Sequence, residues 1–571
     1  MDNRAGIKQK LMARSINLSN PLWYVQLLVI AFLAFFILYP IAILFKESIY
    51  SASEGFTLKW YLEAYTDARS LKAIRDTLFV ALSAGVLATV IGTFIAWVSA
   101  RTNTPLKRAI GMAAIIPFIM PPFIGGLAWT LLASPQAGLL NQFFFWLLGT
   151  KRAINIYTHG GIIFLLGIYT APFVILIVEG ALKSMDTSLE EASMMAKGNI
   201  VKTTLNITLP LVYPAILSGG LLAFVMSLGN FGVPAVIGIP GKIILLTTKI
   251  WTAQSAYPQN FNLGSALGAT LLFFTITGVY FQKRFLEKKS FTTVMGKSTR
   301  VQVIDLGRWR YVTLAICLIY LLVSAVLPIA VLLLSSLRTV WTHYFEWSQF
   351  TLENFNFVLL EYDLTQRGIK NSLLLSTVGA TATILFCAIV AFLAIKAKLP
   401  GKKYLEYLAM ISIGFPGIVL GFGMVRAWIN PPLVLYGTIW IMLLGYFTRY
   451  LPYGYRSVSS TLIQVHPELE ESSLMSRANW FQTFRRITIP LLKPGMVAGW
   501  ILLFISFFRE LNASILLYTP GNEVISVAMF DMWESGEFRH LSAVAIIIII
   551  VAILALFLVR KFSGVDVEVQ S

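Results

Sequence analysis

Two adjacent ionisable residues, Arg509 and Glu510, stand between the apolar stretches GWILLFISFF and LNASILLYTP. Charged side chains inside an apolar segment are costly, and they usually face a partner or a water-filled cavity. These two residues could form an internal ion pair that holds a helix bundle together, or a gate on a path for a polar solute, and the two roles are compatible. We find no cluster of acids, histidines or arginines that suits an enzyme, so no catalytic residue is predicted.

The stretch SLGNFGVPAVIG holds the matching position in an internal repeat, which places Gly229 and Asn230 opposite Arg509 and Glu510. Glycine, asparagine and proline there predict an interrupted helix with backbone groups that face a cavity. We expect the path or gate to be formed by Gly229, Asn230, Phe231, Gly232, Arg509, Glu510 and Asn512. Two further sites, Pro121-Pro122 and Pro416-Gly417, predict helix kinks.

Residues that could bind metal are scattered along the chain. None of the four histidines (His159, His343, His466 and His540) has metal-ligand spacing to another histidine or to a cysteine, so we predict no metal site. Cys317 and Cys387 both lie in apolar runs, which excludes a disulfide framework.

Two long polar loops, at residues 185–210 and 465–490, share one pattern: LEEASMMAKGNIVKTTLNITLP and LEESSLMSRANWFQTFRRITIP. Each begins with acidic residues suited to a helix N-terminus, continues with apolar residues at helical spacing, and ends in a proline that stops one helix or starts the next. Short amphipathic helices of this kind have an apolar face to bury, and the groove of a soluble partner would bury it.

The elements that position these residues must be membrane-spanning helices. The 571 residues are 57% hydrophobic and only 13% charged, whereas soluble proteins carry about 25% charged residues. The net charge of +18 is explained by the preference of basic residues for cytoplasmic loops. Secreted, nuclear and disulfide-scaffold classes are excluded, and nucleic acid is not an expected partner.

The hydropathy pattern predicts an all-α protein of about twelve transmembrane helices. The expected spans are 23–45, 76–100, 109–133, 160–181, 209–238, 263–281, 311–336, 371–396, 404–429, 432–456, 492–518 and 541–559. An even number places both termini on one side. Basic residues cluster in the loops on that side, including Arg101, Lys107, Lys402 and Lys403, so both termini should be cytoplasmic.

The chain divides into two similar halves, 1–281 and 311–571, joined by a basic cytoplasmic linker at 282–310. Pro121 aligns with Pro416 at an offset of 295 residues, and Pro210 aligns with Pro490 at an offset of 280. The difference is an insertion at about 134–159 in the first half, whose FFFW cluster we interpret as an interfacial or re-entrant element. Because each half has an even number of spans, the repeat is parallel, and two similar bundles leave a shared seam.

The two loops resemble the coupling loops of ABC importer permeases, in which Glu-Ala-Ala and Ile-x-Leu-Pro stand at fixed spacing. Here Glu191-Ala192-Ser193 precedes Ile207-Thr208-Leu209-Pro210, and Glu471-Ser472-Ser473 precedes Ile487-Thr488-Ile489-Pro490. The family's glycine position holds Lys197 and Arg477, so the turn is displaced. The residues expected to couple to the ATPase are Glu190, Glu191, Ala192, Ser193, Met194, Met195, Gly198, Ile207, Leu209 and Pro210, then Glu470, Glu471, Ser472, Ser473, Leu474, Met475, Trp480, Ile487, Ile489 and Pro490.

This resemblance implies the type I importer permease fold in the bacterial cytoplasmic membrane, with both halves fused in one chain. It also implies two copies of a separate ABC ATPase, which holds ATP and Mg²⁺, and a periplasmic or lipid-anchored solute-binding protein. The chain itself would carry no cofactor and would contact only these partners and membrane lipid. Glu191 and Glu471 are the expected ion-pair partners of the ATPase.

The fused arrangement looks most like that of ferric-iron permeases, although Asn230 replaces an acid common in that group. Phosphonate, sugar-phosphate, thiamine and polyamine importers share the architecture, and Arg509 could equally favour an anion or a metal carried with one. A twelve-span secondary transporter is an alternative of another class, but it would have no use for paired docking helices and would need more intramembrane acids than Glu510.

Overall fold

The computed structural model describes residues 21–563 except 53, 115, 150–153, 186–187, 197–198, 288–302, 342–346, 398 and 477–478. Most of the predicted linker 282–310 therefore lies outside the described residues. The helices and strands of the first half are α2 (Pro21–Leu33), α3 (Tyr39–Ile49), β1 (Tyr50–Ser51), β2 (Gly55–Phe56), α4 (Lys59–Thr66), α5 (Ala68–Arg101), α6 (Lys107–Ala113), α7 (Ile116–Ile119), α8 (Pro122–Ala133), α9 (Leu139–Leu148), α10 (His159–Ser184), α11 (Ser188–Met195), α12 (Ile200–Thr203), α13 (Leu209–Leu228), α14 (Leu246–Ser255) and α15 (Phe261–Glu287).

The second half follows the same order without counterparts of β1, β2 and α9 among its described residues. Its helices are α16 (Trp309–Leu321), α17 (Leu327–Ser336), α18 (Glu353–Asn356), α19 (Asp363–Leu374), α20 (Ala380–Ile395), α21 (Lys402–Ile411), α22 (Gly417–Trp428), α23 (Ile439–Gln464), α24 (Pro467–Met475), α25 (Trp480–Thr483), α26 (Ile489–Phe508), α27 (Ser514–Leu517), α28 (Ile525–Glu534) and α29 (Phe538–Ser563). Single π or 3₁₀ turns join several of them: η1 (Ala34–Leu38), η2 (Thr204–Thr208), η3 (Pro234–Gly238), η4 (Leu322–Val326), η5 (Trp347–Gln349), η6 (Phe357–Glu361), η7 (Leu375–Gly379), η8 (Ser412–Gly414) and η9 (Phe484–Thr488).

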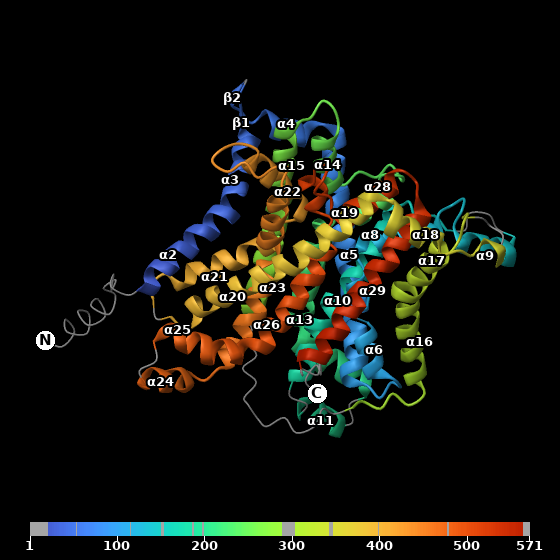
Figure 1. Cartoon of the computed structure of the whole chain (residues 1–571). Coiled ribbons are helices and arrows are strands. Elements are labelled where there is room, and N and C mark those ends of the chain that lie inside the picture. Colours follow the sequence, from blue (N-terminus) through green and yellow to red (C-terminus); the bar gives the residue numbers. More distant parts are fainter. Residues whose placement is uncertain are drawn as a thin grey trace.

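The bundle in Figure 1 is built from long helices that run between its upper and lower ends. In the part of the chain that is described, nine helices are long and apolar enough to cross a membrane, and two bent pairs raise this number to eleven. The pairs are Lys107–Phe118 with Pro122–Ala133, bent by 95°, and Lys402–Gly414 with Gly417–Trp428, bent by 110°. The predicted kinks at Pro121 and Pro416 are therefore confirmed.

A helix or a bent pair lies at each of the twelve expected spans, with three corrections. The tenth span is α23, which begins at Ile439 rather than at 432 and is more polar than the others, since it carries Arg449 and Arg456. The fifth and eleventh spans were expected to extend through 238 and 518, but the helices end at Leu228 and Phe508. Both helices therefore end just before the residues at which the sequence predicts an interruption, Gly229-Asn230 and Arg509-Glu510.

The first span of each half packs against the other half. Helix α3 lies against α22, and α17 lies against α8. Across the first of these contacts, the Arg426 guanidinium donates to both carboxylate oxygens of Glu47 at 2.7–2.8 Å and stacks over the Phe261 ring. Because the first span of each half packs on the other half, these contacts hold the two bundles together along their shared seam.

A glycine allows close helix packing at equivalent places in the two halves. It lies on α5 in the first half, but on α23, the counterpart of α10, in the second half. In the first half Gly92 of α5 faces Val174 of α10, and an added Cβ on the glycine would lie 2.6 Å from the valine Cβ. In the second half Cys387 of α20 occupies the position of Gly92, and Gly454 of α23 occupies that of Val174, with 2.9 Å between an added Cβ and the Cys387 Sγ. Each pair thus keeps one small partner, which close packing of membrane helices requires.

Candidate functional site

The two interrupted helices have the same hydrogen bonds at their breaks. After α13, the Asn230 Oδ1 accepts the N–H of Val233 at 3.0 Å. After α26, the Glu510 Oε1 accepts the N–H of Ala513 at 2.8 Å. A side-chain oxygen that accepts an N–H three residues later satisfies a donor at the start of the next turn. The repeat therefore preserves the function of this position, although its residue type differs.

Each break contacts the other half of the protein. The Asn512 Oδ1 accepts the N–H of Phe231 at 3.0 Å. Gly229 lies against Pro416, whose Cβ would be 3.3 Å from a Cβ added to the glycine. Arg509 donates to the Phe118 carbonyl oxygen, and its guanidinium lies 4.5 Å from the centroid of the Phe118 ring. The breaks therefore meet at the seam, beside the bends of the third and ninth spans.

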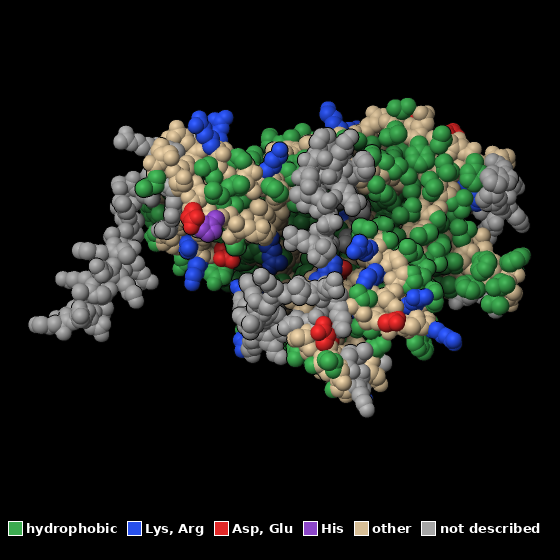
Figure 2. Space-filling view, turned by 90° about the horizontal axis from the view of Figure 1, so that it is seen from below, with side chains coloured by type: hydrophobic (Ala, Val, Ile, Leu, Met, Phe, Trp, Pro, Cys, Tyr) green, Lys and Arg blue, Asp and Glu red, His purple; other side chains and the backbone are tan. Residues whose placement is uncertain are grey.

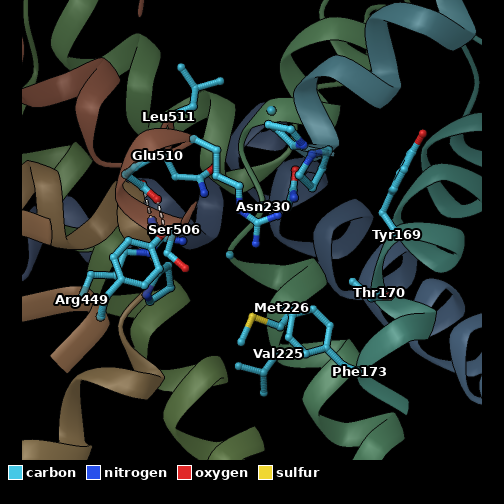
Figure 3. Close-up of a pocket in the computed structure, with 18 of the residues that line it drawn as sticks. Tyr169, Thr170, Phe173, Val225, Met226, Asn230, Arg449, Ser506, Glu510 and Leu511 are labelled. Carbon is cyan, nitrogen blue, oxygen red and sulfur yellow. Dashed lines mark hydrogen bonds and ion pairs between the residues drawn. The ribbon is translucent and has the colours of Figure 1, made fainter. Parts of the chain in front are cut away.

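A cavity of about 170 Å³ lies at this meeting point. Both halves line it, as Figure 3 shows for residues on either side of Asn230. From the predicted set, Gly229, Asn230, Gly232, Arg509, Glu510 and Asn512 line it. Phe231 does not, because its ring is buried beside Trp251 and Phe530.

The two walls of the cavity occupy equivalent positions but differ in chemistry. Tyr169, Thr170 and Phe173 of α10 form one wall, and the equivalent residues of α23, 280 positions later, form the other. Those residues are Arg449, Tyr450 and Tyr453. The charged residues of the lining, Arg449, Arg509 and Glu510, all belong to the second half. They give the described lining two guanidinium groups against one carboxylate.

Glu510 is paired with Arg449 rather than with its neighbour Arg509, which corrects the sequence interpretation. The Arg449 Nη1 donates to Glu510 Oε1 at 2.7 Å, and the Tyr450 hydroxyl donates to Oε2. With the cap to Ala513, the carboxylate has three partners and is 2% exposed. Sequence reasoning missed Arg449, although an arginine within an expected span was a signal of the same kind as Arg509.

The two coupling loops lie at the lower end of the molecule, one beneath each half (Figure 1). Helix α11 and helix α24 begin these loops, and a turn then leads to α12 and α25. The Ser193 and Thr203 hydroxyls bond at 2.8 Å across the first turn, and those of Ser473 and Thr483 bond at 2.9 Å across the second. Seen from below in Figure 2, a hollow separates the two lobes, with Lys and Arg side chains around it.

The first coupling loop is fastened to the bundle by Glu190, which points inward. Its carboxylate lies 3.6 Å from Arg101 Nη1 and accepts the Thr208 hydroxyl at 2.5 Å, and both charged side chains are buried.

A basic residue at the end of the second span of each half also contacts the start of the loop. Arg101 donates to the Met185 carbonyl oxygen, and Lys396 donates to that of Val465 at 2.9 Å. These contacts join each loop to the end of a spanning helix.

Two apolar side chains project from the loops at equivalent positions. Met195 and Met475 are each 87% exposed, at the ends of α11 and α24. Among the other predicted coupling residues, Glu191, Ala192, Pro210, Ser472 and Pro490 are exposed, and Ser193, Ile207, Leu209, Ser473, Ile487 and Ile489 are half-buried. Gly198 and the side chains of Met194, Glu470, Glu471, Leu474 and Trp480 lie outside the described residues.

Both halves of the chain are similar to known transport proteins. A family model described as "Binding-protein-dependent transport system inner membrane component" matches residues 88–290 and 383–563. The chain is 28% identical over 527 residues to the ferric transport system permease protein FbpB of Actinobacillus pleuropneumoniae, covering 92% of this chain and 75% of the relative. It is 23% identical to the Fe(3+)-transport system permease protein FbpB 2 of Haemophilus influenzae, over 95% and 99% of the two chains.

A half-length relative also matches. A protein of Salmonella paratyphi A described as the 2-aminoethylphosphonate transport system permease protein PhnV is 28% identical over 242 residues, 42% of this chain and 88% of the relative.

Two repeated helical bundles, a cavity at their seam and a matched pair of loops define a multi-pass membrane transport subunit. The family match includes both loops and most of each bundle. The chain belongs to the family of binding-protein-dependent transport system inner membrane components, as a permease with both halves on one polypeptide, and the secondary-transporter alternative is set aside.

Proposed function

We propose that this chain forms the complete membrane pathway of an ATP-driven importer of the bacterial cytoplasmic membrane, most specifically for ferric iron. A binding protein, periplasmic or lipid-anchored, would deliver the solute at the end opposite the coupling loops. Two copies of a separate ATPase would bind ATP and Mg²⁺ on the cytoplasmic side. The full-length relatives described as ferric permeases support iron as the cargo.

The observation that carries the proposal is the matched exposure of Met195 and Met475. An exposed apolar side chain at the tip of each loop suits insertion into a cleft on a partner. Since the loops are equivalent, one cleft type on two identical ATPase subunits would accept both. Closure of the ATPase dimer on ATP would then move the loops, and the buried Arg101–Glu190 contact would transmit that motion to α5.

The orientation follows from the position of the basic residues. Lys107 precedes the first bent span and Lys402 precedes the second, at the same end of these helices in the two halves. The preference of Lys and Arg for cytoplasmic loops supports a cytoplasmic side for this end, the coupling loops and both termini.

The charge of the cavity constrains how iron would cross. Two guanidinium groups and one buried, fully bonded carboxylate leave a positive lining, which repels a bare trivalent cation. Within the described residues, no group of three His, Cys, Asp or Glu side chains could hold a metal ion. Ferric iron would therefore pass with anionic ligands. The same lining favours a second candidate cargo, a phosphonate, and the PhnV-like relative supports it.

The test is uptake in proteoliposomes that contain this chain, its ATPase and its binding protein. We expect radiolabelled ferric iron, supplied on the binding protein, to enter only with ATP. Replacement of Met195→Asp and Met475→Asp together should lower iron-stimulated ATP hydrolysis about tenfold or more, because a charge would enter each apolar cleft. Tyr257→Asp is the control, since Tyr257 is 98% exposed and lies far from both loops in the sequence and fold.

Three results would count against the proposal. Uptake of 2-aminoethylphosphonate without uptake of iron would replace iron by the second candidate. Stimulation of ATP hydrolysis by neither solute would reject both cargoes. Unchanged ATPase binding and hydrolysis in the double methionine variant would reject the coupling role of the loops.

A further inference from the structure

Helix α9 is an insertion with no counterpart among the described residues of the second half. It lies within the segment 134–159, directly after α8, and its ten residues read LLNQFFFWLL. In Figure 1 it stands at the right flank of the molecule, outside the upper end of α17. Neither the cavity nor the coupling loops use this helix.

The start of α9 is fixed to both ends of the insertion by the side chain of Asn141. Asn141 is 5% exposed, and its Nδ2 donates to the carbonyl oxygens of Ser134 at 2.9 Å and Ile154 at 2.7 Å. Its Oδ1 accepts the N–H of Ile154 at 2.7 Å. One buried side chain therefore joins both ends of the insertion, and the helix projects in a fixed direction.

The rest of α9 presents apolar side chains outward. Trp146 is 79% exposed, Leu148 63%, Leu147 56% and Phe143 52%. Four large apolar side chains at this exposure, on a helix of ten residues, form an apolar patch that water alone would not stabilise.

The surface next to this patch indicates what covers it. Helix α16 and the turn after it, on the same flank, are part of a membrane span and expose Ile319, Val326 and Leu318 by 47–59%. Side chains exposed on a membrane span face lipid, and α9 lies on the same flank, beside the upper end of α17 (Figure 1). Trp and Phe are the residues that favour the boundary between hydrocarbon and headgroups.

We propose that α9 is an interfacial anchor that inserts its Trp146 end into the outer leaflet of the membrane and so fixes the outer end of α8. Helix α8 matters for transport, because it begins at the Pro121 bend and its first residues, Pro122 and Phe123, line the cavity.

The other half fixes the equivalent point differently. Helix α22 corresponds to α8, and its last residue, Trp428, corresponds to Ala133. Near that end, Arg426 is held by Glu47 and Phe261 of the first half. The position equivalent to Arg426 is Leu131, which cannot form an ion pair. Lipid contact through α9 thus replaces, for the end of α8, the ion pair that holds the end of α22.

The test measures depth directly and does not depend on the cargo. A spin label is attached to Trp146→Cys in nanodiscs of phosphatidylethanolamine and phosphatidylglycerol, with Tyr257→Cys as the water-exposed control. Both native cysteines are buried, and each can be replaced by alanine if it takes up label. We expect the label at 146 to collide more with oxygen than with a water-soluble nickel chelate, and the label at 257 to show the reverse.

Equal nickel accessibility at positions 146 and 257 would overturn the proposal. So would protection at 146 that requires added binding protein, since that result would assign the patch to protein docking. As a second measurement, Trp146→Asp with Leu147→Asp should leave ATPase binding intact and lower solute-stimulated ATP hydrolysis at least threefold. Unchanged hydrolysis would overturn the link to α8, whereas the importer proposal would stand.

Discussion

The side-chain oxygen of Asn512 accepts the backbone N–H of Phe231 at 3.0 Å, and so ties the broken eleventh span to the broken fifth span. Phe231 is fully buried, so its N–H depends on this acceptor. The equivalent of Asn512 in the first half is Gly232, which packs against Phe123 instead. Within the described residues, one hydrogen bond therefore joins the two breaks directly, and the first half offers no symmetric copy of it. Any rocking of the two halves that separates the breaks must release it.

Replacement of Asn512→Ala should destabilise the folded protein by about 1–3 kcal/mol, because it leaves a buried N–H without an acceptor. Asn512→Asp keeps an acceptor oxygen and should lose less. Thermal unfolding in detergent can be followed with a thiol-reactive dye, since Cys317 and Cys387 are buried and become reactive only on unfolding. Equal midpoints for the wild type and Asn512→Ala would show that this bond contributes nothing to the seam.

The inward direction of Glu190 predicts different effects for two adjacent glutamates. Glu190→Gln removes one charge of a buried pair with Arg101, and breaking such a pair costs about 3–5 kcal/mol. Helix α11 should then detach from α5, and hydrogen exchange at residues 188–195 should increase. Glu191→Gln should leave this exchange near the wild-type rate, because the Glu191 side chain is exposed. Equal exchange in both variants would contradict the fastening role of Glu190.

Much of the architecture could be predicted because the repeat supplies two observations of each element. Prolines at 121 and 416, and polar residues at 230 and 510, stand at equivalent places in apolar segments, so their breaks were expected. Membrane helices leave few ways to accommodate such residues. The short helices of the two loops were predicted for the same reason, since a repeated amphipathic pattern is hard to obtain by chance.

The partners of the charged residues could not be predicted. Arg509 is adjacent to Glu510 in sequence, but successive residues at a helix end point in different directions, and Arg449 reaches the carboxylate from another helix. Similarly, Glu190 and Glu191 both lie in the first turn of α11, and only the position of Arg101 decides which of them is buried. Such choices depend on helix rotation, which the sequence pattern does not determine.

The lowered pKa of Asp67 predicts a pH effect at the start of α5. Its carboxylate accepts both the hydroxyl and the N–H of Ser70 at 2.8 Å, and with the nearby Lys249 these bonds lower its pKa to about 2. A lowered pKa in the folded state stabilises the protein at pH values above the ordinary carboxyl pKa, and the stabilisation is lost as the pH falls towards 2.

Asp67→Asn keeps a capping oxygen but cannot ionise. The thermal midpoint of the wild type should exceed that of Asp67→Asn by a constant amount between pH 7 and pH 5, and this difference should shrink as the pH falls from 4 towards 2. The effect should be small, because the Asp67 side chain is 42% exposed and solvent screens its charge. A difference that grows on acidification would contradict this assignment.

The internal repeat supplies its own control for the buried Arg449–Glu510 pair. At the equivalent positions the first half has Tyr169 and Asn230, and Asn230 caps its helix without any ion pair. Glu510→Asn alone should destabilise the protein by about 3–5 kcal/mol, because Arg449 would be left without its carboxylate. Adding Arg449→Tyr should recover most of that loss, since both positions then carry the neutral residues of the first half.

Uptake by this double variant separates the two roles of the pair. The double variant loses one positive and one negative charge, so the net charge of the cavity lining does not change. Arg509 remains as its charged residue. We therefore expect the recovered double variant to transport solute within about threefold of the wild-type rate, a free-energy difference below 1 kcal/mol, in proteoliposomes with its ATPase and binding protein. Normal stability with abolished uptake would instead mean that the ion pair itself opens and closes the path, and that its bonds to Arg449 and Tyr450 must break in each transport cycle.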